Sequence, residues 1–275
     1  MHHTFSKKAF TLVELAIVMT IIGLLIGGIL KGQELLENAR ITSTIAQVKS
    51  FDAAVSTFRD IYDSLPGDLP NAENRIPGCN ANCNPSTTPE GIYSAGDGRV
   101  SWDWSDGWEE HALDHIPATN ISAETILFWM HLYKANLISG IEDVSKHPEL
   151  AGDDTMYAGH VAPTGKAGGV YTAATSLGAG TPALGSPLTE SPRGLLLALT
   201  STTWPAANQM HGDVLSPSRV AQIDRKMDDG KPAAGSLTVW GKTDPLCYID
   251  QGGGNFDYNE QSSVKGCGFM IILQN

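Results

Sequence analysis

Residues 10–30 read FTLVELAIVMTIIGLLIGGIL, an apolar run whose one charged residue is Glu14. A helix rises ~1.5 Å per residue, so about 20 residues are enough to cross the ~30 Å hydrocarbon layer of a bilayer. The run therefore predicts a membrane-spanning helix. A carboxylate within such a span costs roughly 2.5 kcal/mol or more, which makes Glu14 a candidate functional residue.

The residues that flank this run predict its orientation. Residues 1–9, MHHTFSKKA, are polar and basic, and Lys7 and Lys8 stand just before the run. The positive-inside bias keeps these lysines in the cytoplasm, so the bulk of the chain is expected to lie outside. A secretory signal peptide would carry its small-residue cleavage site after the apolar core, whereas Ala9 precedes it.

An amphipathic pattern continues from the apolar run without a break. Apolar residues recur at spacings of three and four, on one helical face: Ile41, Ile45, Val48, Phe51, Val55, Phe58 and Tyr62. The pattern ends at Pro66-Gly67-Asp68, because proline and glycine break helices. We predict one helix of about 55 residues, roughly 80 Å long. Its second half is expected to pack against a globular domain.

The rest of the chain mixes helices, strands and long loops. Cap, stop and strand signals predict two helices and three strands: Ser122–Ile138, Ser216–Asp228, Ser236–Trp240, Cys247–Asp250 and Cys267–Leu273. Residues 66–121 and 151–194 are expected to be loop-rich. The predicted fold is α+β, with the long N-terminal helix packed on a globular domain that holds an antiparallel sheet. The expected parts are the basic N-terminal segment (1–9), the membrane-spanning half of the long helix (10–30), its amphipathic half (31–65) and the globular domain (66–275).

Composition narrows the possible partners and chemistry. The formal net charge of −12 disfavours general binding to nucleic acid, because an acidic surface repels phosphates. Four cysteines, at positions 79, 83, 247 and 267, lack zinc-ligand spacing. An even cysteine count in an exported chain favours disulfides, with three possible pairings. The alternative is four separate buried thiols.

One histidine pair is a candidate metal site. His111 and His115 are four residues apart, with Glu109 and Glu110 beside them, so a helix would place both imidazoles on one face. The His-Glu-x-x-His order of zinc proteases is absent, and Pro117 limits such a helix. Solvated surface histidines are the preferred interpretation.

Two sets of carboxylates are candidate calcium ligands. One set is Asp250 with Asp257 across a glycine turn, and the other contains four aspartates: Asp224, Asp228, Asp229 and Asp244. Neither has the EF-hand pattern, and such carboxylates often lie at helix ends and turns. We therefore expect no cofactor, with calcium as the alternative.

Three tryptophans, Trp102, Trp104 and Trp108, are interleaved with aspartates. An exposed ligand platform is one interpretation of this cluster. Packing in the core of the loop region is favoured, because tryptophan is highly buried on average.

The segment from Lys7 to Glu14, KKAFTLVE, closely resembles the N-terminus of the type IV prepilin family, which includes the pseudopilins of secretion systems. The shared features are the basic leader, the small residue before Phe10, Glu14 within the apolar run and the amphipathic continuation. The resemblance implies cleavage between Ala9 and Phe10 by a prepilin peptidase, and N-methylation of the new Phe10 amine. It also implies that Glu14 pairs with the Phe10 amine of a neighbouring subunit during assembly.

The chain departs from the family pattern at two positions. Ala9 stands where the family usually has glycine, and Lys31 stands where many members have proline. The helix is therefore expected to lack the usual kink.

Two weaker resemblances lie near the C-terminus. Many pilins have a disulfide there, and the resemblance implies a bond between Cys247 and Cys267. Cys79 and Cys83 are also predicted to bond to each other, because the short loop between them is within reach of disulfide geometry. The string IDRKMDDGKP at 223–232 is similar to a segment of certain large pilin-like proteins, with no function attached.

The resulting hypothesis is a structural subunit of a type IV pilus or a type II secretion pseudopilus, not an enzyme. The protein would sit in the inner membrane as a single-pass protein with a periplasmic head, and then enter the pilus or pseudopilus. Its expected partners are other subunits, the prepilin peptidase, the inner-membrane assembly platform and the lipid bilayer. The alternatives are a minor pilin acting as an adhesin or tip initiator and, more remotely, a membrane-tethered metal hydrolase.

Overall fold

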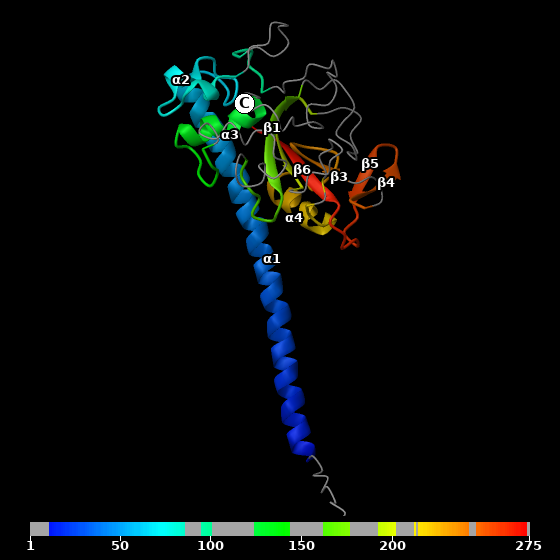
Figure 1. The fold of residues 1–275 in the computed structure, drawn as a ribbon. Coiled ribbons are helices and arrows are strands. Elements are labelled where there is room, and N and C mark those ends of the chain that lie inside the picture. The colour runs from blue at the N-terminus through cyan, green and yellow to red at the C-terminus, as the bar shows by residue number, and fades with distance from the viewer. Residues whose placement is uncertain are drawn as a thin grey trace, which may run out of the picture.

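The computed structural model describes residues 11–85, 95–100, 124–143, 162–176, 192–201, 212, 214–241 and 246–273. One long helix carries a head of shorter helices and two antiparallel sheets (Figure 1). This arrangement confirms the predicted α+β fold. The proposed metal pair His111 and His115, with Glu109 and Glu110, lies outside the described residues, as do Trp102, Trp104 and Trp108.

The long helix, α1 (Leu12–Tyr62), has 51 residues and runs unbroken through Lys31. It ends before Pro66 because Asp63 adopts a left-handed conformation, with a φ of 53°, and caps the last turn. Every described residue from 11 to 30 is exposed. The buried residues of α1 begin at position 41 and follow one face: Ile41, Thr44, Val48, Phe51, Ala54, Val55 and Phe58. The first half of α1 therefore projects from the head, as Figure 1 shows.

The main sheet has four antiparallel strands in the order β1-β2-β6-β3. They are β1 (Val170–Ser176), β2 (Gly194–Thr200), β6 (Cys267–Ile272) and β3 (Leu237–Gly241). The prediction of a loop through 151–194 was wrong at β1, and β2 was not predicted as a strand. Both strands have mostly buried residues on both faces, so they lack the alternation by which a half-buried strand is recognised.

A separate two-stranded sheet pairs β4 (Tyr248–Gly252) with β5 (Asn255–Tyr258). The predicted strand at Cys247–Asp250 exists, but it belongs to this hairpin and not to the main sheet. Its partner β5 was not predicted.

Four helical segments complete the described head: α2 (Ala72–Arg75), η1 (Ala81–Cys83), α3 (Glu124–Lys134) and α4 (Pro217–Met227). The predicted end of α3 at Ile138 was wrong. Asn136 is left-handed, with a φ of 60°, and the Leu137 N–H donates to the Leu132 carbonyl, which closes a Schellman motif. Helix α4 begins with Pro217 directly after Ser216, as predicted.

The core joins α1 to the head through aromatic contacts. The Phe51 ring on α1 lies 5.0 Å from the Trp129 ring on α3 and 5.2 Å from the Tyr171 ring on β1, centroid to centroid. Both pairs are edge-to-face, a favourable geometry for aromatic rings. An ion pair between Glu37 and Arg219 links α1 to α4 just before α1 leaves the head. These contacts fix the direction in which the apolar half of α1 projects.

Candidate functional site

The start of α1 is organised by a reciprocal pair of residues. Thr11 is the N-cap, and its hydroxyl oxygen accepts a hydrogen bond from the Glu14 N–H at 3.3 Å. One carboxylate oxygen of Glu14 accepts from the Thr11 N–H at 2.9 Å and from the Thr11 hydroxyl at 2.8 Å. This arrangement is a capping box, which satisfies backbone donors that the first turn of a helix leaves free.

The negative charge of Glu14 has no cation to neutralise it within the described part of α1's first turns. The first basic residue there is Lys31, which lies about 25 Å along the axis at ~1.5 Å per residue and pairs with Glu34. The hydroxyl of Thr20, by contrast, is satisfied inside the helix, because it donates to the Ala16 carbonyl at 2.8 Å. Glu14 is therefore the group in this apolar segment that an outside cation would stabilise most.

The surface around Glu14 is apolar and uncovered. Leucine, isoleucine, valine and methionine side chains between positions 12 and 30 are all largely exposed. Within the described residues, α1 is the one helix long and apolar enough to cross a membrane, judged by length and composition. Lipid or other apolar helices are the surroundings that such a surface requires.

Residues 4–30 match the family model of the prokaryotic N-terminal methylation motif. This segment carries the type IV prepilin and pseudopilin signature. The chain matches no curated protein and no solved structure. The motif implies processing by a prepilin peptidase and assembly with other pilin subunits.

The predicted cleavage and methylation residues, Ala9 and Phe10, lie outside the described part of the chain. The structure places Glu14 against Thr11, a partner that the sequence interpretation missed. The signal was present, because Thr11-x-x-Glu14 before an apolar run is the capping-box pattern.

Removing the Thr11 hydroxyl should loosen the first turn of α1 without changing the charge of Glu14. We expect Thr11→Val to cost about 1 kcal/mol of local helix stability, because the cap acceptor is lost. Thr11→Ser keeps the hydroxyl and should retain the cap. The measurement is amide hydrogen exchange at Glu14 in micelles, where equal rates in the two variants would contradict this role.

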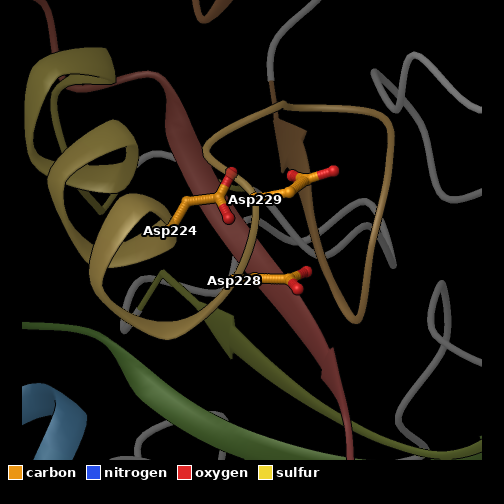
Figure 2. Close-up of side chains that lie close together, drawn as sticks. All are labelled: Asp224, Asp228 and Asp229. Carbon is orange, nitrogen blue, oxygen red and sulfur yellow. The ribbon is translucent and has the colours of Figure 1, made fainter.

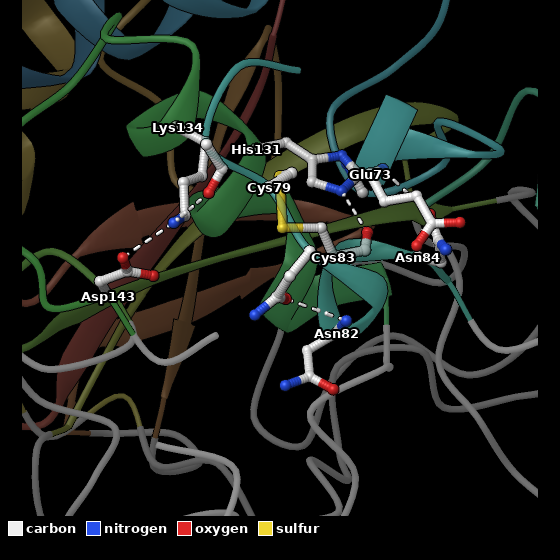
Figure 3. The surroundings of a disulfide bond; sticks show 11 residues. Glu73, Cys79, Asn82, Cys83, Asn84, His131, Lys134 and Asp143 are labelled. Carbon is white, nitrogen blue, oxygen red and sulfur yellow. Dashed lines mark hydrogen bonds and ion pairs between the residues drawn. A yellow bond between two sulfur atoms is a disulfide. The ribbon is translucent and has the colours of Figure 1, made fainter. Parts of the chain in front are cut away.

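The described cysteines form two bonds, Cys79–Cys83 and Cys247–Cys267, with Cα–Cα distances of 5.7 and 5.4 Å. These are the same pairs that we predicted from the sequence. Figure 3 shows the first bond beside His131 and Lys134 of α3. The second joins β6 to the residue before β4, so it links the two sheets.

Non-reduced peptide mapping should recover both pairs. We expect Cys247→Ser to lower the free energy of unfolding by roughly 3 kcal/mol, because the bond closes a loop with a sequence separation of 20. Cys79→Ser opens a loop with a separation of only 4 and should cost less. A peptide joining Cys79 or Cys83 to either C-terminal cysteine would contradict the pairing.

A buried histidine connects the end of α1 to the Cys79–Cys83 loop. The Gly67 N–H donates to His131 Nδ1 at 2.9 Å, so His131 Nε2 carries the proton and donates to the Cys83 carbonyl at 2.8 Å (Figure 3). The ring also stacks on Phe58. Gly67 is required here, because its φ is +89° and a Cβ would lie 2.3 Å from the Glu124 carbonyl oxygen.

Burial lowers the pKa of His131 to about 4. The folded pKa lies below the unfolded value near 6.5, so the stabilisation from neutral His131 is complete above pH 6.5 and is lost as the pH falls toward 4. Burial raises the pKa of Asp224 to about 6. Because this folded pKa lies above the unfolded value, the contribution of Asp224 to stability is lost as the pH rises toward 6, opposite to that of His131. Imidazole NMR resonances separate the two effects. We expect His131 to stay neutral until about pH 4; a midpoint near 6.5 would contradict its burial.

Three of the proposed calcium ligands lie together. Oxygen atoms of Asp224, Asp228 and Asp229 come within 4.8 Å of one another at the C-terminal end of α4 and on the chain that follows it (Figure 2). Backbone or side-chain donors already engage each residue: Asp224 accepts from the Tyr258 hydroxyl at 2.7 Å, and Asp229 from the Lys231 N–H at 2.8 Å. These hydrogen bonds hold the chain that follows α4 in place, which accounts for the closeness of the three carboxylates.

Two other candidate calcium ligands, Asp250 and Asp257, lie in the β4–β5 hairpin and not in this cluster. In the hairpin register, Asp250 faces Phe256 and Asp257 faces Ile249, so the two carboxylates point to opposite faces of the sheet. This register does not bring the two carboxylates to one face, and calcium binding by Asp250 and Asp257 stays an alternative that nothing here tests. Asp244 lies outside the described residues.

Proposed function

We propose that this chain is a structural subunit of a type IV pilus or a type II secretion pseudopilus, and that it is not an enzyme. The observation that supports the proposal most is the methylation motif on a helix whose first half projects, bare and apolar, from the head. Such a helix can lie in the bilayer before assembly and against neighbouring helices afterwards.

The chemistry of assembly follows from Glu14 and Phe10. Cleavage after Ala9 creates a new amine at Phe10, and an amine is the kind of cation that Glu14 lacks within the described part of α1. A neighbouring subunit at the right axial offset would bring its amine to Glu14, and pairing in low dielectric would favour that offset over others. Glu14 would then select the register of the growing filament.

We propose a single-pass orientation with the leader in the cytoplasm and the head outside the inner membrane. Lys7 and Lys8 support this orientation through the positive-inside bias. The two disulfides support it as well, because bonds of this kind persist in oxidising compartments.

The functional test is the distribution of the subunit between membranes and sheared filaments. A structural subunit should be abundant in sheared filaments or, for a short pseudopilus, should be required for protein secretion. Absence from both structures and no effect of gene deletion on piliation or secretion would overturn the proposal.

A minor pilin that initiates the tip or binds a surface is a second candidate. The size of the head favours it, because residues 66–275 make up most of the chain. Abundance separates the two roles, since a minor pilin would be a rare component of filaments made mainly of another subunit.

A further inference from the structure

Strand β3 is the outermost strand of the main sheet. It pairs with β6 on one side, and no described strand pairs with it on the other. In an antiparallel ladder alternate residues turn their N–H groups away from the partner, and here Leu237 and Val239 do so. An open edge of this kind is a template for pairing with another chain.

The chain that follows α4 occupies this edge. One carboxylate oxygen of Asp228 accepts hydrogen bonds from the Ser236 N–H and, at 2.9 Å, from the Leu237 N–H. The Val239 N–H donates to the Pro232 carbonyl at 2.9 Å. The two outward N–H groups of Leu237 and Val239 are therefore satisfied by residues 228–232, and neither is available to an incoming strand.

Several contacts hold residues 228–232 in this place. Asp224 is fully buried, accepts from the Tyr258 hydroxyl and accepts from the Gly230 N–H at 3.2 Å, so the turn is tied to both α4 and β5. Gly235 has a φ of +77°, and a Cβ there would lie 1.9 Å from the Asp228 carboxylate. Glycine at 235 is what allows Asp228 to reach the backbone of β3.

We propose that residues 228–232 form an edge guard, which prevents a second copy of this chain from adding its own strand to β3. The residues are of the kinds that protect natural sheet edges, since Asp229 and Lys231 are exposed charges and Pro232 has no N–H to offer a ladder. The edge guard gives a role to the IDRKMDDGKP string at 223–232. The inference does not depend on polymerisation through α1.

The test compares two aspartate variants of the full chain, in detergent with at least a tenfold excess of micelles over protein. Asp228→Ala removes the contact to Leu237 of β3 and the contact to Ser236 just before it. Asp229→Ala removes the same charge from the same loop. In the described structure the Asp229 carboxylate accepts only from the Lys231 N–H, so this variant is the matched control. Amide hydrogen exchange reports the edge, and analytical ultracentrifugation over a range of concentrations reports association.

In the wild type we expect Leu237 and Val239 to be protected from exchange. In Asp228→Ala, Leu237 should exchange about tenfold faster or more at low concentration, while Phe269 in the sheet interior keeps its protection. The same variant should form dimers or larger species as concentration rises, whereas the wild type and Asp229→Ala should not.

Three results would overturn the edge guard. One is an Asp228→Ala protein that stays monomeric with Phe269 protected. A second is equal association of Asp229→Ala, which would point to charge and not to the edge. The third is exchange of Leu237 and Val239 in the wild type at the rate of an unstructured peptide. If Asp228→Ala unfolds the head, so that Phe269 loses protection, the exchange rates of Leu237 and Val239 in the wild type are the measurement that tests the edge guard.

Discussion

Replacing Glu14 with leucine is expected to leave the protein in the membrane fraction and to remove it from filaments. Insertion should be at least as good as in the wild type, because the substitution takes a carboxylate out of the apolar run. The Phe10 amine of the neighbouring subunit would then be left unpaired in low dielectric, which typically costs about 3–5 kcal/mol. A loss of this size corresponds to a drop in filament yield of about a hundredfold or more.

Two control variants separate the charge of Glu14 from its other contacts. Thr20→Val removes a hydroxyl that donates only within its own helix, so filament yield should stay near the wild-type value. Thr11→Val removes the cap but keeps the carboxylate, so it should cost far less yield than Glu14→Leu. The measurement is subunit in membranes against subunit in sheared filaments. Normal filaments from Glu14→Leu would refute the assembly role, and loss of this variant from membranes would show that Glu14 acts earlier.

A bulky residue at position 9 should block both processing and assembly. We expect Ala9→Phe to accumulate in the inner membrane as a precursor that still carries Lys7 and Lys8. In this precursor the Phe10 nitrogen is part of a peptide bond, so no amine is available to pair with Glu14. Filaments should therefore be absent, with an effect as large as that of Glu14→Leu.

Ala9→Gly is the matched control, because it places the residue usual in the prepilin family before Phe10. It should be processed at least as fast as the wild type. Immunoblots that resolve precursor from mature subunit, taken over time after synthesis begins, measure both rates. Mature subunit from Ala9→Phe at the wild-type rate would rule out cleavage at this bond.

Features with a local physical cause could be predicted from the sequence. The single long helix follows from an apolar run and from a spacing of three and four that continues to Tyr62. The start of α4 at Pro217 follows from the preference of proline for the first helical turn. The capping box at Thr11 was equally local and could have been recognised from the four residues that form it.

Features that depend on distant neighbours could not be predicted in this way. Strand β1 reads VYTAATS, whose small and β-branched residues show no periodicity because tertiary packing covers both faces. The end of α3 depends on Asn136 adopting a left-handed conformation, whereas the sequence prediction extended this helix to Ile138, just before Gly140. The role of Asp228 at the edge of β3 depends on a turn that brings it to Leu237, nine residues away.

The N-terminal peptide of the subunit recovered from sheared filaments tests the pilin assignment most directly. Mass spectrometry of that peptide should show a chain that begins at Phe10 and carries one methyl group on its amine. The same sample should lack peptides that contain Lys7 and Lys8. A filament subunit that begins at any other residue, or an unmodified Phe10 amine, would contradict the processing that we derive from the motif at residues 4–30.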